Sequence, residues 1–359
     1  MKAMFHLPTA VYAGQGSYKD IPALLSGRSV LIVTDSGLAS TPVLAMVRSA
    51  LDTYGISNQI YTDIQQNPDQ ATVERLVSHI RNQGIDQLIA LGGGSPLDAA
   101  KAAAALVTNE GSLDEYQWEG RQFTSEQLPL VAVPTTAGTG SEVTGVAVIT
   151  SRNIKKGIVS TAIFPHAAVI DPLLMTGMPP FLTAATGLDA LTHAIEAYIG
   201  LNANPITDSM ALEAIRMITS SLPSAYRNGE DLKAREAMAV ASTLAGIAMD
   251  QAGLGIVHSL SSPVCAYLHQ PHGFANAMLL PFGMEFNLPA AADKLAALAP
   301  LFGNHSKGTE KDLARSAVTG VRNLISEVGL DEKIAEVRSE QVDIKLFGAD
   351  AAKMFLIRN

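Results

Sequence analysis

Four side chains in the second half of the chain are of types that bind a transition metal. Asp189 and His193 are four residues apart in ATGLDALTHAIEAYI, so on a helix they project from one face, one turn apart. Further along, His258 and His272 each stand near glycines that permit close packing. Imidazole combined with carboxylate suits iron, zinc, nickel or manganese, whereas calcium and magnesium prefer oxygen ligands. We therefore predict that these four residues bind one divalent transition metal ion.

Coordination number favours one of these metals, although the spacing does not. Tetrahedral zinc would be saturated by four protein ligands, whereas an ion that accepts five or six ligands keeps room for a substrate oxygen. This favours ferrous iron, with zinc as the alternative. An aspartate and a histidine at this spacing are more often a simple hydrogen-bonded pair, so the prediction also depends on the loops described next.

A glycine-rich loop in the first half is typical of a phosphate-binding turn. LIALGGGSPLDAAKAAAAL reads as a strand, a turn at Gly92–Gly94 and a helix. Ser95 would be its N-cap, Pro96 its first residue, and Asp98 would complete a spacing like that of a capping box. Glycines let the backbone approach a ligand, and free N–H groups at a helix start favour phosphate. The alternative is an ordinary strand-to-helix turn.

A second polar loop and an acidic residue complete the predicted nucleotide site. PTTAGTGSEVT supplies hydroxyls from Thr135, Thr136, Thr139 and Ser141 after another expected strand. Together the two loops suit a pyrophosphate and two riboses. The glycine spacing is not GxGxxG, and the acidic Asp35 precedes the loop, so a standard Rossmann interpretation fails. Asp35 can accept from ribose hydroxyls and repel a 2′-phosphate, which favours NAD over NADP.

The predicted nucleotide site lies in a region of alternating strands and helices. Up to about residue 180, aliphatic runs such as SVLIVTDSG, DQLIALGGGS and LPLVAVPTTAG alternate with segments of helical periodicity. Each run is nearly continuous in apolar residues, as in parallel strands that are covered on both faces. We expect an α/β domain with a parallel sheet over residues 1–181.

The predicted metal ligands lie in a region of different character. After a Pro-Pro pair the chain becomes rich in Ala, Leu and Met, with apolar residues at helical spacing. One example of this spacing is Leu212, Ile215, Ile218 and Leu222, and Pro223 is expected to end that helix. We expect an all-α metal-binding and substrate domain over residues 182–359.

Composition narrows the classes of partner. The 359 residues are 47% hydrophobic, enough for about two domains with substantial cores. The net charge of -9 makes nucleic acid a poor partner. Cys265 is the one cysteine, which excludes an internal disulfide framework and agrees with a reducing compartment. No segment reaches the ~20 apolar residues of a membrane span. We expect a soluble, cytoplasmic protein without a membrane partner.

Four motifs together resemble the signature stretches of the iron-containing, or group III, alcohol dehydrogenases. They are GGGSPLDAAK, PTTAGTGSEVT, GLDALTHAIEAY and PHGFANAMLLP, and the resemblance extends from about residue 5 to residue 330. It implies an N-terminal α/β nucleotide-binding domain and an all-α C-terminal domain, in a dehydroquinate synthase-like architecture. It also implies an active site between the domains and, usually, a homodimer.

The resemblance assigns roles to individual positions. It implies metal ligands at Asp189, His193, His258 and His272. It implies NAD contacts at Asp35, Asn67, Gly93, Gly94, Ser95, Asp98, Thr135, Thr136, Thr139 and Lys155. For Asn67 and Lys155 the resemblance is the sole support; otherwise they would read as an Asx turn before Pro68 and a solvated basic residue.

The activity that follows is hydride transfer between a small primary alcohol or diol, or its aldehyde, and NAD. The substrate oxygen would bind the metal, which lowers the pKa of the hydroxyl, and the carbinol hydride would pass to the nicotinamide. One alternative is a glycerol dehydrogenase-like or maleylacetate reductase-like enzyme of the same fold. Another is a non-catalytic protein that binds a nucleotide or a metal.

Two positions depart from the family pattern. The family often has a second histidine one turn after His258, where this chain has Ser262. Proton release would then run through Ser262, His269 or water. The ending GADAAKMFLIRN stops before a terminal segment that many relatives carry, so we expect a shortened chain.

Overall fold

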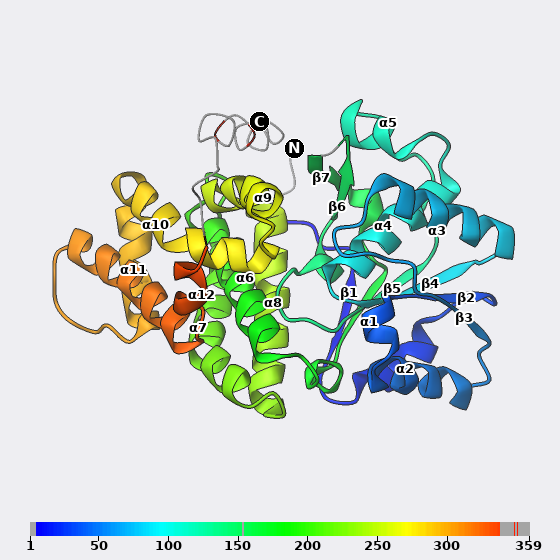
Figure 1. Ribbon diagram of the computed structural model, residues 1–359, viewed down its shortest axis with the longest axis horizontal. Helices are drawn as coiled ribbons and strands as arrows, with labels where there is room; N and C mark the ends of the chain where they lie inside the picture. The colour runs from blue at the N-terminus through cyan, green and yellow to red at the C-terminus, as the bar shows by residue number, and fades with distance from the viewer. Residues whose placement is uncertain (1–4, 153, 338–347, 349, 351–359) are drawn as a thin grey trace. The chain divides into compact units, whose positions relative to one another are not determined.

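The computed structural model describes residues 5–152, 154–337, 348 and 350 (Figure 1). They form two compact units. The α/β unit contains residues 7–136 and 140–175. The helical unit contains the described residues before Leu7, residues 137–139 and those from Thr176 onward. The expected chain ending, residues 348–359, lies almost entirely outside the described residues.

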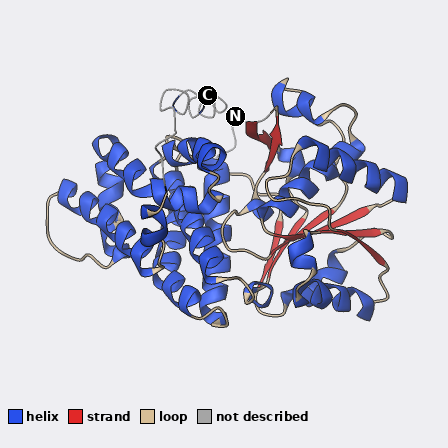
Figure 2. Ribbon diagram, in the orientation of Figure 1, coloured by secondary structure: helices blue, strands red, loops and turns tan. Residues whose placement is uncertain are grey.

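A parallel sheet forms the centre of the α/β unit, where its strands appear red in Figure 2. Its order is β1-β8-β5-β4-β2-β3, and every pairing is parallel. The strands are β1 (Ala10–Ala13), β2 (Val30–Val33), β3 (Asn58–Tyr61), β4 (Gln87–Gly92), β5 (Leu130–Pro134) and β8 (Ala167–Ile170). The three aliphatic runs form β2, β4 and β5, which are adjacent and fully buried. The predicted parallel sheet is confirmed.

Helices cover both faces of this sheet. Leu88 and Ala90 of β4 contribute to a core on one face with α3 and α4, whereas Ile89 and Leu91 join a core on the other face with α2. This alternation follows from the two-residue period of a strand. The helices are α1 (Ser36–Ala39), α2 (Pro42–Thr53), α3 (Gln70–Gln83), α4 (Gly94–Thr108) and α5 (Leu113–Trp118). A hairpin of β6 (Val146–Ser151) and β7 (Ile154–Val159) packs beside α4 and α5.

The helical unit is built around α6 (Pro180–Ile199), which packs against α7, α8 and α10 (Figure 1). Its other helices are α7 (Pro205–Arg227), α8 (Leu232–Ala252), α9 (Ile256–Leu268), α10 (His272–Ala297), α11 (Glu310–Glu327) and α12 (Asp331–Ala335). Most of α6 is buried, which explains why its sequence is apolar on nearly every side. The expected all-α second half is confirmed.

The predicted helix end at Pro223 is wrong. Helix α7 continues through Pro223 to Arg227. Proline lacks the N–H that a helix interior needs, but Leu222, Pro223 and Ala225 are all buried. Packing of this turn against the unit therefore outweighs the missing backbone hydrogen bond.

Among the described residues, no single helix is both long and apolar enough to cross a membrane. One pair, α8 with α9, meets the length and composition test together, but it is bent by 107°.

Candidate functional site

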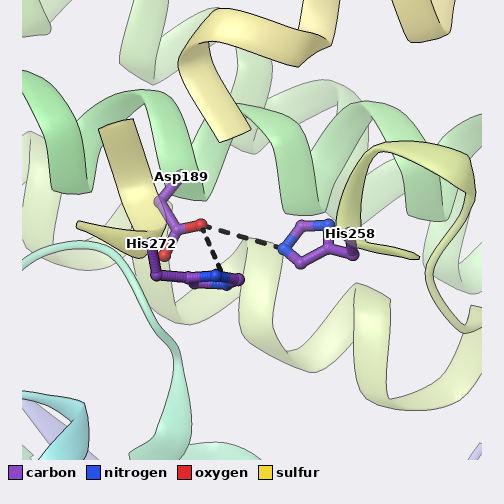
Figure 3. Close-up of side chains that lie close together, drawn as sticks. All are labelled: Asp189, His258 and His272. Atoms are coloured by element: carbon purple, nitrogen blue, oxygen red, sulfur yellow. Dashed lines mark ion pairs between the residues drawn. The ribbon is translucent and has the colours of Figure 1, made fainter. Parts of the chain in front are cut away.

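Helix α6 positions the first two predicted metal ligands. Asp189 and His193 lie one turn apart, as predicted, and both are buried. The Asp189 carboxylate oxygen Oδ1 lies 4.0 Å from Nε2 of His193 and 3.8 Å from Nε2 of both His258 and His272. Figure 3 shows the carboxylate facing the last two rings. Thus the structure brings together all four predicted ligands from α6, α9 and α10.

A glycine allows α10 to bring His272 to this cluster. A Cβ atom on Gly273 would overlap the carbonyl oxygen of Ala185 on α6. With glycine at this position, the first turn of α10 lies against the middle of α6. His272, the first residue of α10, is therefore held beside Asp189.

Hydrogen bonds fix how two of the rings are turned. Nδ1 of His193 lies 3.1 Å from the carbonyl oxygen of Gly138, which belongs to the same unit. Nδ1 of His258 lies 2.7 Å from Oε2 of Glu196. Both Nδ1 atoms thus donate outward, and both Nε2 atoms are turned toward Asp189. The two rings also stack, with centroids 4.5 Å apart.

Asn276 lies at the centre of the cluster. Its Nδ2 is 2.6 Å from Oδ1 of Asp189, 3.0 Å from Nε2 of His258 and 3.2 Å from Nε2 of His272. The side chain is fully buried, and its Oδ1 has no hydrogen-bond partner in the described part of the chain. An ion bound by the same three atoms could not share this position with the amide. Metal binding therefore requires the Asn276 side chain to turn aside.

The charges of the cluster favour cation binding. Burial opposes ionisation of Asp189, but the neighbouring imidazoles, His193 first, outweigh it and hold the pKa of this carboxyl far below its usual range. Burial lowers the pKa of His193 to about 4, so this ring is neutral at neutral pH. Burial also opposes a charge on His258, but the carboxylates of Asp189 and Glu196 raise its pKa to about 9. A permanent carboxylate beside these imidazoles attracts a divalent cation.

The donor set fits a transition metal. One donor atom each from Asp189, His258 and His272 lies within 4.8 Å of the other two, and His193 adds a fourth donor beside Asp189. Three imidazole nitrogens with one carboxylate oxygen form a mixed set suited to iron or zinc rather than to calcium or magnesium.

The two predicted proton-relay residues lie on the chain segment that joins His258 to His272. Ser262 is a partly buried residue of α9, one turn after His258. His269 is exposed and ends α9 in a left-handed conformation, with φ of 51°. Ser261, the residue before Ser262, brings its hydroxyl to 3.5 Å from Nδ1 of His272.

In the α/β unit, the glycine loop has the expected strand-turn-helix form, but its cap differs. Helix α4 begins at Gly94, with Gly93 as N-cap, so the prediction of Ser95 as N-cap is wrong. Gly92 has φ of 151°, which a side chain disfavours, and the turn is completed before Ser95 is reached. Gly93 offers no side chain to the first N–H groups of α4. These groups suit a phosphate, as predicted for this loop.

Three of the predicted cofactor residues form one hydrogen-bonded group. The N–H of Asn67 donates to Oγ of Ser95 at 3.2 Å, and Nζ of Lys155 donates to Oδ1 of Asn67 at 3.0 Å. Asn67 itself is left-handed, with φ of 54°. Asn67 and Lys155 therefore lie beside the start of α4. Their predicted role as NAD contacts had rested on the family resemblance alone.

Asp98 has a role that the capping interpretation missed. Its two carboxylate oxygens accept from Oγ of Ser141 at 2.6 Å and from the N–H of Val148 at 3.0 Å, so it ties α4 to the second loop and to β6. Burial raises its pKa. Nearby, Nζ of the buried Lys101 donates to the carbonyl of Ser141 at 2.8 Å and to Oγ1 of Thr144 at 3.1 Å. Lys101 therefore fixes the same loop.

The remaining predicted cofactor residues divide between the units. Thr135 is buried at the end of β5, and its N–H donates to the carbonyl of Gly92 at 2.9 Å. Thr136 follows it in the α/β unit, whereas Thr139 belongs to the helical unit. Asp35 is the N-cap of α1 and accepts from the N–H of Leu38 at 2.9 Å. It follows β2 with one residue, Thr34, between them, as expected for an acidic residue near a strand end.

Three residues that contact the predicted metal ligands could not be assigned a role from the sequence: Glu196, Asn276 and Gly138. Glu196 lies three residues after His193, so it shares their helix face, and this spacing was a usable signal. Asn276 lies four residues after His272, a spacing that likewise places two residues on one face of a helix. The Gly138 carbonyl had none, because backbone acceptors depend on the fold.

Comparison with known proteins gives a consistent match over both units. Residues 8–172 match the model for iron-containing alcohol dehydrogenase, and residues 183–359 match that for the C-terminal part of the Fe-containing alcohol dehydrogenase family. The chain is 37% identical to the NAD-dependent methanol dehydrogenase of Bacillus methanolicus, covering 97% of this chain and 92% of that protein. It is 40% identical to the 1,3-propanediol dehydrogenase of Klebsiella pneumoniae, covering 92% and 86%. A crystal structure of a 1,3-propanediol oxidoreductase superposes with a TM-score of 0.93 at 37% identity, covering 97% and 93%.

Proposed function

This chain belongs to the iron-containing alcohol dehydrogenase family, and from that premise we propose that it interconverts small primary alcohols or diols and their aldehydes. It is a metal-dependent, NAD-linked oxidoreductase, and iron is the metal that the family indicates. The observation that carries the proposal is the convergence of the Asp189 carboxylate with three imidazoles.

The chain's own residues prepare the site for this chemistry. A divalent ion held there lowers the pKa of a substrate hydroxyl, and NAD accepts the hydride. Asp189 supplies the fixed negative charge, and His193 is neutral at neutral pH and ready to bind through Nε2. Glu196 and the Gly138 carbonyl hold two of the rings in position. Because these contacts already restrict the rotation of the two imidazole rings, less conformational freedom is lost when a metal ion binds.

We propose that NAD binds at the loops of the α/β unit. The start of α4 at Gly93 and the group formed by Asn67, Ser95 and Lys155 support a pyrophosphate there. The proposed contacts are Asp35, Asn67, Gly93, Gly94, Ser95, Asp98, Thr135, Thr136, Thr139 and Lys155. Since the hydrogen bonds of Asp98 tie α4 to β6, we expect a part of its effect to be structural.

Proton release is proposed to involve Ser262, His269 or water. Ser262 follows His258 by one turn of α9, which is the support for it. His269 is exposed and its imidazole has two ring nitrogens that can carry a proton, which is the support for the second. Ser262→Ala and His269→Ala should each be tested for a shifted pH profile of kcat. A profile unchanged in both variants would leave water as the relay.

We also propose a cytoplasmic homodimer with a nucleotide-binding domain over 1–181 and a metal and substrate domain over 182–359. Strand β1 supports the dimer, because it is an edge strand with exposed side chains that include Val11 and Tyr12. The single cysteine, Cys265, supports the reducing compartment. Sedimentation at equilibrium tests the dimer.

A direct assay tests the activity. Purified protein loaded anaerobically with Fe²⁺ is expected to reduce NAD with at least one of methanol, ethanol, 1,3-propanediol and 1,2-propanediol, followed by NADH absorbance. Parallel arms with Zn²⁺ and with glycerol test the glycerol dehydrogenase-like alternative. If no alcohol or diol supports NAD reduction with either metal, the proposed function is wrong.

A further inference from the structure

Glu196 is a buried residue whose two carboxylate oxygens both accept hydrogen bonds from residues of one neighbouring helix, α9. Its exposed fraction is 3%, and it lies on α6 three residues after His193. Oε1 accepts from the N–H of Val257 at 2.7 Å, and Oε2 accepts from Nδ1 of His258 at 2.7 Å. A buried carboxylate is costly unless it is well paired, and here each oxygen has a partner.

These two contacts set the start of α9 and the orientation of its metal ligand together. Val257 is in the first turn of α9, where N–H groups have no partner within the helix. The N-cap is Gly255, which makes no side-chain cap, so Glu196 caps α9 from another helix. The same carboxylate holds the His258 proton on Nδ1. Nε2 is then the nitrogen that remains available to an ion.

The residue at position 255, a glycine, leaves room for the Glu196 carboxylate, and this observation is independent of the hydrogen bonds. A Cβ atom on Gly255 would lie 2.7 Å from Oε1 of Glu196 and 3.1 Å from its Cδ. The backbone of Gly255 has φ of -118° and ψ of -152°, which L residues also adopt. A larger residue at this position would therefore have to displace the Glu196 side chain, so glycine is favoured here by room rather than by backbone conformation.

We propose that Glu196 is a positioning residue of the metal centre, whose carboxylate caps α9 and presents Nε2 of His258 to the ion. This inference rests on the proposed function, because it takes the four-residue cluster as the metal site. Only a carboxylate meets both requirements. The two bonds go to different oxygens of Glu196, whereas an amide has one oxygen and one NH₂ group, so one of the two positions would hold a donor facing another N–H.

The first test is Glu196→Gln, with Fe²⁺ affinity measured anaerobically by competition with a chromophoric chelator. We expect the dissociation constant to rise by about 10- to 100-fold, the range typical for loss of a group that orients a metal-binding histidine. Long-range ¹⁵N spectra of metal-free protein, recorded above about pH 9 where the wild-type ring carries a single proton, should also show His258 moving toward the Nε2–H tautomer. If affinity and tautomer both match those of the wild type, the inference is wrong.

The second test reaches the same carboxylate without changing it. Gly255→Ala is expected to displace Glu196 and to weaken Fe²⁺ binding by about tenfold. Gly177→Ala is the control, since nothing lies within 4 Å of the added Cβ atom. If Glu196→Gln fails to fold, Gly255→Ala decides, and wild-type affinity in it contradicts the inference. Wild-type protein that binds no Fe²⁺ would instead overturn the proposed function.

Discussion

His258 bonds to Glu196 through one ring nitrogen and faces Asp189 with the other, so metal and proton compete for it. Its pKa is raised to about 9, so below that pH the free ring carries a second proton that a metal must displace. Metal affinity is therefore expected to rise by about tenfold per pH unit between about pH 7 and pH 9 and to level off above. Chelator competition across this range measures it, and an affinity that falls with rising pH would contradict the expectation.

A second prediction at the level of single residues concerns Asn276. Its amide nitrogen occupies the space among three ligand atoms, so an ion must displace it and break its bond to Asp189. Asn276→Ala removes this competition. We expect metal binding to tighten by about 1 kcal/mol, the contribution of a typical hydrogen bond, or roughly fivefold.

The control for this variant is Asn287→Ala on the same helix. Asn287 donates to the carbonyl of Gly283 at 2.8 Å and does not contact the cluster in the described structure. Calorimetric titration with Fe²⁺ compares the two variants with the wild type. Weaker binding in Asn276→Ala alone would mean that the amide assists the ion rather than competing with it.

Asp35 provides a test of the proposed cofactor preference. Asp35→Asn keeps an oxygen that can accept from the N–H of Leu38, so α1 stays capped, but it removes the negative charge. Because a carboxylate repels a 2′-phosphate, kcat/KM for NADP is expected to rise by about tenfold relative to NAD. An unchanged ratio would place the adenosine ribose away from Asp35.

The four proposed ligands could be selected from the sequence because each carries its chemistry in its residue type and spacing, and the structure brings their side chains together. Asp189 and His193 share a helix face by arithmetic alone, whereas His258 and His272 needed the supporting motifs. Glu196 and Asn276 were missed because a carboxylate or an amide on a helix is ordinary until a fold brings it to a ligand. Their roles depend on the contacts of α6 with α9 and α10.

At the level of elements, the approach of α10 to α6 depends on one glycine. A Cβ atom at Gly273 would overlap the Ala185 carbonyl, so Gly273→Ala must push the first turn of α10 away from α6. We expect a loss of about 1–3 kcal/mol in the free energy of unfolding, the usual cost of overpacking. We also expect weaker metal binding, because His272 moves with that turn.

Thermal unfolding and metal titration check this prediction. Gly177→Ala serves as the matched control, since its added methyl group meets no atom within 4 Å. If Gly273→Ala and Gly177→Ala lose the same amount of stability, the contact between α10 and α6 is not the cause of the loss. Stability and metal affinity equal to the wild type in Gly273→Ala would show that α10 can shift without moving His272.

Elements were predictable where burial and periodicity agreed. Apart from Gln87 at the start of β4, the runs that form β2, β4 and β5 have no polar side chain, as expected for strands covered on both faces. The helix end predicted at Pro223 and the N-cap predicted at Ser95 were wrong because both predictions used only the neighbouring sequence. Packing of α7 outweighed the first, and the glycine turn placed the cap of α4 two residues earlier than the second predicts.

At the scale of the whole molecule, the proposed metal site and most of the proposed NAD contacts belong to different units. All four proposed metal ligands belong to the helical unit, and the glycine loop with its hydrogen-bonded neighbours belongs to the α/β unit. Removing the metal with a chelator is therefore expected to abolish turnover while NAD affinity changes by less than about threefold. Calorimetric titration of NAD into chelated and metal-loaded protein measures this. Turnover that survives complete removal of the metal would contradict its place at the reaction centre.

The short segment 137–139 belongs to the helical unit although both of its flanks belong to the other. It carries the Gly138 carbonyl that holds the His193 ring. A gene cut at the junction of 175 and 176 would therefore yield a C-terminal half without that carbonyl. If the two halves of the gene were exchanged between relatives, His193 would come from one parent and the Gly138 carbonyl that holds its ring from the other. A chimaera of this enzyme should therefore transfer residues 137–139 together with the helical unit.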